Sequence, residues 1–276
     1  MYSCPINSLL VIDNYMSATG DDQGVIKIWD NRKEEAVMTF SEHEDYISQM
    51  TYSRSKKTLV AVGGDGYLST WDIRKPDVVA MSDQIEDELL SIALMKNDKK
   101  AVVGTQEGIL SLWTWGDWGD YNDRIVGHPN SIDAICKLDE DTICTGSSDG
   151  IIRLVGILPN EFHGVLGDHG EDMPIENLKL THDKRYLLSS GHDDRLQFWD
   201  VAHLFQEEEE KAAIEEEEPE PEKVTKEDSD KDSWGTDSDE DTKSKKKDRK
   251  RKKTQKKEAI KSAKKNTNNT AFFADM

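Results

Sequence analysis

The chain contains few cysteines and no long apolar run. Three cysteines in 276 residues, Cys4, Cys136 and Cys144, form neither an even set nor a Cys-x-x-Cys pair. We therefore expect small buried thiols of an intracellular protein, not a disulfide framework or a structural zinc site. No apolar run approaches the roughly 20 residues that cross a membrane. The first residues, MYSCPINSLLV, also lack the charged start and apolar core of a secretory signal, so we expect a soluble protein.

Charge divides the chain into three parts. Residues 1–205 carry 18 Lys/Arg against 35 Asp/Glu, a net charge of −17. Residues 206–242 carry 4 against 18, and residues 243–276 carry 14 against 3. The last two parts have few apolar residues, so we expect an acidic disordered linker at 206–242 and a basic disordered tail at 243–276.

A repeated unit occupies the first part. Trp29, Trp71 and Trp113 are spaced 42 residues apart, the next position in the series is Val155, and Trp199 follows 44 residues later. Six residues before each of these positions, a short polar turn separates two apolar runs. The turn pairs are Gln23-Gly24, Asp65-Gly66, Glu107-Gly108, Asp149-Gly150 and Asp193-Asp194. Such pairs favour tight hairpins, and the flanking runs alternate apolar and polar residues as strands do. Several short strands in each unit of this length predict an all-β propeller over residues 1–205.

These units resemble the WD-repeat family, which carries Gly-His near the start of a unit and Trp-Asp at its end. Gly127-His128 matches the first motif, and His43 and His169 occupy similar places. Trp-Asp stands at 29–30, 71–72 and 199–200. The unit ending GILPN and the segments ATGDDQGVIKIWDNRK and SSGHDDRLQFWD resemble a nucleolar group of WD-repeat proteins linked to ribosome production. Propellers of this family usually have seven blades, so the resemblance implies about two further blades before the five seen; closure with five is the alternative.

The resemblance also implies a buried hydrogen-bond chain of His, Ser or Thr, Asp and Trp in each unit. By register, only the last unit has all four, His169, Ser189, Asp193 and Trp199. The second unit has Ala61 at the hydroxyl position, and the fourth has Val155 in place of Trp.

The same residue types could form a nucleophilic triad, but related sets recur in other units, so we favour the structural interpretation. His192, Asp193 and Asp194 form a weak metal pattern, because adjacent residues on a hairpin point to opposite faces. There is no glycine-rich phosphate loop leading into a helix. We expect no enzyme activity, cofactor, metal or small-molecule substrate.

Two surface features remain open. Trp118 and Tyr121 lie in a Gly/Asp loop, where they could grip a peptide or an unpaired base, although packing against the neighbouring blade is favoured. The segments WDNR and WDIR fit a Trp-Asp-x-Arg pattern that the resemblance links to substrate receptors of cullin-4 ubiquitin ligases. Arg32 and Arg74 would then contact the ligase adaptor.

The tail suggests targeting. A dense Lys/Arg run predicts a nuclear import signal or an RNA-binding arm; its central residues are Lys245, Lys246, Lys247, Arg249, Lys250, Arg251, Lys252 and Lys253. Ser229, Thr236 and Ser238 each have an acidic residue three positions later and resemble acidophilic-kinase sites; a plain solvating linker is equally compatible.

We expect a non-catalytic nucleolar scaffold in ribosome biogenesis and ribosomal RNA processing. It would hold pre-ribosomal proteins on the propeller loops and RNA on the tail. The alternative function is that of a substrate receptor of a cullin-4 ubiquitin ligase.

Overall fold

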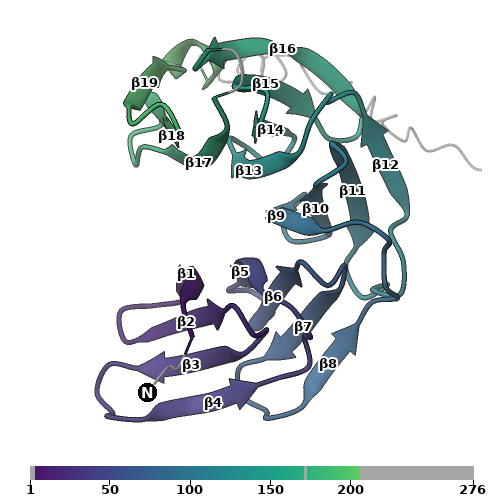
Figure 1. Cartoon of the computed structure of the whole chain (residues 1–276), viewed down its shortest axis with the longest axis vertical. Coiled ribbons are helices and arrows are strands. Elements are labelled where there is room, and N and C mark those ends of the chain that lie inside the picture. The colour runs from purple at the N-terminus through teal and green to yellow at the C-terminus, as the bar shows by residue number, and fades with distance from the viewer. Residues whose placement is uncertain (1–3, 171–172, 206–276) are drawn as a thin grey trace, which may run out of the picture. The chain divides into compact units, whose positions relative to one another are not determined.

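The strands form five antiparallel sheets, one for each predicted repeat (Figure 1). The computed structural model describes residues 4–170 and 173–205. The first sheet contains β1 (Ile6–Val11), β2 (Met16–Asp21), β3 (Ile26–Asp30) and β4 (Ala36–Phe40). The second contains β5 (Ile47–Ser53), β6 (Thr58–Gly63), β7 (Leu68–Asp72) and β8 (Val78–Met81). In each sheet the strands lie side by side in chain order.

The remaining sheets follow the same plan. The third contains β9 (Leu89–Met95), β10 (Lys100–Thr105), β11 (Ile109–Thr114) and β12 (Asp123–Val126). The fourth contains β13 (Ile132–Lys137), β14 (Thr142–Ser147), β15 (Ile151–Gly156) and β16 (Glu161–Asp168). The fifth has three strands, β17 (Ile175–Leu180), β18 (Tyr186–Gly191) and β19 (Leu196–Asp200). The predicted all-β propeller architecture is confirmed, with five sheets in the described residues; a seven-bladed whole stays a prediction.

The hydrophobic core lies between neighbouring sheets. One buried cluster joins the first and second sheets and includes Ile28, Phe40 and Trp71. Three further clusters join the second sheet to the third, the third to the fourth, and the fourth to the fifth. The strand β7 is buried along its whole length, because a sheet covers each of its faces. This is why one repeat cannot fold alone and why the chain repeats the unit.

Each sheet has two distinct ends. Because neighbouring strands run antiparallel, the turns that join the second and third strands lie at the same end as the links between sheets. We call this the connection end. The opposite end, which carries the turns between first and second strands and the Trp-Asp pairs, is the Trp–Asp end. The turn at Gly66 shows how tightly the connection end packs: its φ is +76°, and an added Cβ would lie 2.2 Å from the Ile85 carbonyl oxygen. Only glycine fits there.

The cysteines partly match the prediction. Cys136 and Cys144 are buried thiols opposite each other on β13 and β14, and burial raises the pKa of Cys136. Cys4 is partly exposed, so the prediction that it is buried was wrong. Its place just before β1, outside the sheets, explains the difference. Among the described residues, no helix is both long and apolar enough to cross a membrane.

Candidate protein-interaction site

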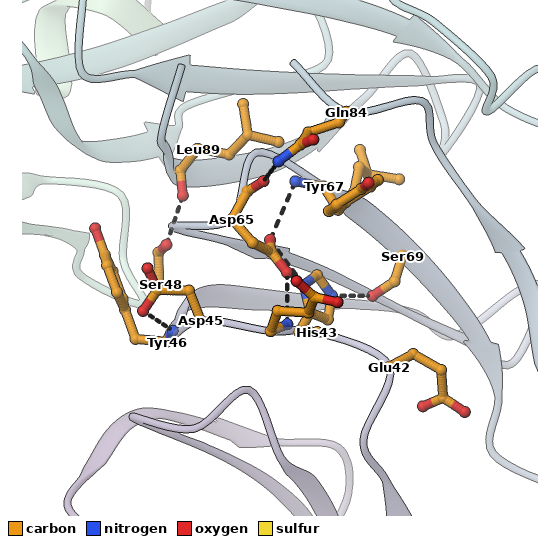
Figure 2. A network of polar contacts seen from close by, with 12 residues as sticks. Glu42, His43, Asp45, Tyr46, Ser48, Asp65, Tyr67, Ser69, Gln84 and Leu89 are labelled. Atoms are coloured by element: carbon orange, nitrogen blue, oxygen red, sulfur yellow. Dashed lines mark hydrogen bonds and ion pairs between the residues drawn. The ribbon is translucent and has the colours of Figure 1, made fainter. Parts of the chain in front are cut away.

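A buried hydrogen-bond chain links the connection end of the second sheet to the tryptophan on β7. His43 Nδ1 lies 3.0 and 2.9 Å from the two carboxylate oxygens of Asp65, and its Nε2 lies 2.7 Å from Ser69 Oγ. Trp71 Nε1 donates to the same hydroxyl at 2.9 Å. Figure 2 shows His43 between Asp65 and Ser69. The chain ties a connection, a turn and a strand into one unit.

Asp65 holds the connection in place as well as the histidine. Its carboxylate accepts hydrogen bonds from the backbone amides of Glu44 and Tyr67 at 3.0 and 3.1 Å. Burial raises the pKa of Asp65, but the hydrogen bonds from His43 and from the two amides outweigh it, so the net pKa is lowered. The carboxylate is therefore stabilised in its charged form inside the turn.

The prediction that only the last unit has a full set was wrong, because the second unit has one too. Ala61 cannot supply a hydroxyl, but it pairs in register with Ser69 on the neighbouring strand. From there the Ser69 hydroxyl takes the bridging role between His43 and Trp71. The sequence signal existed: Ser69 lies two residues before the tryptophan, and Ser111 bonds to Trp113 from the same position at 3.1 Å.

The fifth sheet contains the predicted set. His169 Nε2 lies 2.6 Å from Ser189 Oγ, and its Nδ1 lies 3.0 Å from the Asp193 carboxylate. Trp199 Nε1 donates to Ser189 Oγ at 2.8 Å. The structure thus brings all four residues together in the order that the resemblance implies.

The fourth sheet has a broken version. His128 Nε2 lies 2.8 Å from Thr145 Oγ1, but its buried Nδ1 has no hydrogen-bond partner among the described residues. Asp149, the turn carboxylate, instead accepts two hydrogen bonds from Arg153, at 3.1 and 2.6 Å. Burial, and then the nearby Arg153 charge, lower the pKa of His128 to about 4. This histidine stays neutral because a positive charge there would be buried close to the charge of Arg153.

The geometry does not suit the hydroxyls for nucleophilic attack. Ser69 and Ser189 are at most 1% exposed, and each accepts a hydrogen bond from an indole. A nucleophile must reach its substrate, whereas these oxygens are enclosed by their own sheet. The arrangement satisfies buried polar groups in two sheets, which is a structural role.

The residues of the weak metal pattern do not form a metal site; His192 instead contacts a glutamate. His192 Nε2 lies 2.9 Å from a carboxylate oxygen of Glu176, and both side chains are largely exposed. Asp193 points instead to His169. No three His, Cys, Asp or Glu side chains gather into a metal-binding group in the part of the chain that the structure describes.

The aromatic loop at 115–121 packs inward. Trp118 is only 7% exposed and meets Trp115 edge to face at 5.1 Å. Tyr121 is half-buried and meets Trp113 edge to face at 6.2 Å. Trp118 belongs to the buried cluster between the second and third sheets, and Tyr121 packs against it. The predicted packing against the neighbouring blade is therefore confirmed, and the alternative of an exposed aromatic grip was wrong.

Arg32 and Arg74 stand at the Trp–Asp end in matching poses. Arg32 donates from Nε and Nη2 to the two oxygens of Asp30, at 2.8 and 2.7 Å. Arg74 makes the same pair of bonds to Asp72, both at 2.7 Å. Hydrogen bonds from these arginines lower the pKa of Asp30 and Asp72 to about 2. The two guanidinium groups are thus oriented by their own turns, and the side chains remain 61% and 59% exposed.

A groove at the Trp–Asp end was not predicted from the sequence. It has a volume of about 560 Å³ and lies between the first turns of the first and second sheets. Its lining includes Ile12, Asp13, Tyr15, Tyr52, Arg54 and Lys57. We call it the Tyr15 groove. The residues come from two repeats 42 positions apart, and no motif marks them, so only the packing of the sheets reveals it.

Comparison with known proteins places the repeats in one family. The WDR55 family model matches residues 1–204. This chain belongs to the WDR55 family. It is 43% identical to WD repeat-containing protein JIP5 of Cryptococcus neoformans, over 76% of this chain and 56% of that protein. It is 43% identical to human WD repeat-containing protein 55, over 74% and 53% of the two chains, and 42% identical to the Arabidopsis thaliana protein of the same name, over 73% and 57%.

This WDR55-family chain spans little more than half the length of the curated relatives that it matches. The family model covers the repeats and ends before the charged segments. The predicted targeting residues 245–253 and the predicted phosphorylation sites Ser229, Thr236 and Ser238 lie outside the described residues. They stay predictions for this WDR55-family chain. The boundaries of the predicted linker and tail, after residues 205 and 242, also stay predictions.

Proposed function

We propose that this WDR55-family protein is a non-catalytic nucleolar scaffold that acts in ribosome biogenesis and ribosomal RNA processing. The propeller would bind pre-ribosomal proteins through its loops, and the basic segment would direct the chain to nuclei and nucleoli and contact RNA. The single observation that carries the proposal is the separation of charge. Residues 1–205 have a net charge of −17, so they repel phosphates, whereas residues 243–276 carry 14 Lys/Arg against 3 acidic residues.

The buried networks support the scaffold half of the proposal. The side chains of His43, His169 and their partners form hydrogen bonds with one another inside single sheets, so they are not available to a ligand. What remains for binding are the turns at the two ends, which vary freely over a fixed framework. A rigid frame with variable loops suits a protein that holds other proteins together.

The basic run can be tested by removing its charge. Replacing all eight residues Lys245, Lys246, Lys247, Arg249, Lys250, Arg251, Lys252 and Lys253 with alanine should disperse a fluorescently tagged protein from nucleoli, because its contacts to RNA phosphates are electrostatic. The control exchanges each lysine for arginine and each arginine for lysine, which keeps the charge and should keep the location. Unchanged nucleolar fluorescence in the alanine variant, with normal ribosomal RNA precursors after depletion, would refute the proposal.

The second candidate is a substrate receptor of a cullin-4 ubiquitin ligase. The observation that favours it is the matched pose of Arg32 and Arg74, each oriented by its own aspartate and more than half exposed. Two alike guanidinium groups on adjacent sheets offer a repeated contact to one partner.

The receptor candidate makes its own prediction. The double variant Arg32→Ala, Arg74→Ala should lose most capture of the ligase adaptor in a pulldown from cells. The matched control is Arg195→Ala, an exposed arginine at the connection end. Equal adaptor recovery from the wild type and both variants would remove the receptor candidate.

A further inference from the structure

The Tyr15 groove combines two tyrosine rings with unpaired positive charge. Ile12 is 2% exposed at its base, whereas Tyr15 is 53% exposed on its wall. Arg54 and Lys57 are exposed on its rim, and neither has an ion pair or side-chain hydrogen bond within the described residues. The groove is therefore unlike the rest of this acidic body, where carboxylates outnumber cations.

Further cations frame the groove. The Arg32 guanidinium lies 4.5 Å from the centre of the Tyr15 ring, and Arg74 interacts electrostatically with Tyr52. The acidic residue in the lining, Asp13, accepts hydrogen bonds from the amides of Tyr15 and Met16 at 2.7 and 2.9 Å. Its carboxylate is thus satisfied by the local turn. The surface fits a ligand that carries carboxylates around a small apolar centre.

The chain itself contains such a segment. Residues 207–218 read EEEEKAAIEEEE, with two blocks of four glutamates around Ala212, Ala213 and Ile214. The last described residue, Phe205, lies at the Trp–Asp end, because Val201 donates to the Arg185 carbonyl oxygen and Lys184 Nζ lies 5.0 Å from the Phe205 ring centre. The acidic segment therefore starts at the same end of the sheets as the groove.

The fifth sheet, from which the segment leaves, and the first sheet lie around the same central cavity. Strands β1, β5, β9, β13 and β17 all line one central cavity of about 410 Å³, so the first and fifth sheets border a common space. Nine residues separate Phe205 from Ile214, and an extended chain of nine residues spans about 30 Å. Tethering raises the effective concentration of the segment near the groove and favours even a weak interaction.

We propose that residues 207–218 occupy the Tyr15 groove of the same chain, with Ile214 against the rings of Tyr15 and Tyr52, and glutamates against Arg54 and Lys57. The interaction is independent of the proposed function. It also covers the ring on which Arg32 lies, so a partner that uses Arg32 must first displace the segment. The contact of the segment with the groove is electrostatic in part, so it weakens as salt rises and the segment is then displaced more easily.

Zero-length carbodiimide crosslinking of the full-length protein tests the proposal, because it joins a lysine amine to a carboxylate only when they touch. Peptide mapping should find Lys57 joined to glutamates in 207–218 more often than Lys33 or Lys75, exposed lysines on the outer turns of the same two sheets. A free tether predicts the reverse order, with Lys184 dominant because it lies beside Phe205.

Two variants sharpen the test without removing the reporter lysine. Arg54→Glu should lower the Lys57 crosslink yield several-fold by reversing the charge on the rim, and Ile214→Asp should lower it by removing the apolar contact. Arg195→Glu, at the other end of the sheets, should leave it unchanged. Circular dichroism checks that the variants keep the strand content of the wild type.

Three results would overturn the proposal. The first is a Lys57 yield no higher than that of Lys33 and Lys75, or one that does not respond to Arg54→Glu. The second is coupling of the glutamates chiefly to lysines 245–257, which would show that the acidic segment pairs with the basic run instead. The third is a Lys57 crosslink found only between chains when ¹⁴N- and ¹⁵N-labelled proteins are mixed, which would place a second copy in the groove.

Discussion

Replacing Trp71 with alanine is expected to lower the free energy of unfolding by about 3–5 kcal/mol, the usual range for removing a large buried aromatic side chain. Trp71 is 0% exposed, and its ring stacks on Phe40 of the first sheet at 4.3 Å. The change therefore empties the layer between two sheets and removes the indole donor to Ser69. Urea unfolding of the full chain, followed by far-ultraviolet circular dichroism, measures the loss.

Trp29→Ala is the matched control. Trp29 stands at the same repeat position and donates to Thr19 Oγ1 at 2.7 Å, but it is partly exposed. Its replacement should cost roughly 1–3 kcal/mol, less than Trp71, because less surface leaves the core. Equal losses for the two variants would contradict the assignment of Trp71 to a layer between sheets.

The second large effect concerns the histidines. His43→Ala should lower the free energy of unfolding by about 2–4 kcal/mol, because it removes the hydrogen-bond partner of two buried groups, Asp65 and Ser69. Each buried group that loses its partner costs about 1–3 kcal/mol. His128→Ala should cost only about 1–2 kcal/mol, because His128 makes one such bond and its Nδ1 is already unpartnered. Both histidines are nearly fully buried, so exposure does not explain the difference.

Asparagine variants separate hydrogen bonding from packing in this comparison. Asp65→Asn keeps the shape of the turn but weakens the link to His43, so it should destabilise the chain. Asp149→Asn breaks a pair with Arg153 and leaves His128 unaffected, so His128→Ala should add to it independently. A double variant of His43 and Asp65 should instead lose less than the sum. Additive losses for His43 and Asp65 would refute the shared network.

The sheets could be predicted because the period of the repeat is written in every unit. A tryptophan or valine at a fixed place and a polar turn six residues earlier mark the end of a strand and the preceding hairpin, and the structure has β3, β7, β11, β15 and β19 at these places. Local turn chemistry and strand alternation act over a few residues, so they are visible in a single sequence.

The details of the networks could not be predicted from position alone. Ser69 replaces the hydroxyl missing at Ala61 because antiparallel pairing places the two residues opposite each other, which counting along the chain does not show. Arg153, on the strand that follows the turn, pairs with Asp149 and takes it away from His128, which lies in the link before β13. The Tyr15 groove depends on how two sheets pack, so its residues carry no motif. The burial of Trp118 could be predicted, because large apolar rings favour burial over exposure.

Crosslinking of the intact protein in living cells, followed by mass spectrometry, tests the central claim most directly. The claim is that a WD-repeat propeller holds pre-ribosomal proteins while the basic run keeps it at ribosomal RNA. We expect pre-ribosomal proteins to dominate the crosslinks to residues 4–205, and the variant with eight alanines in residues 245–253 to lose them. A partner set dominated by the cullin-4 ligase adaptor, or one without pre-ribosomal proteins, would contradict the account.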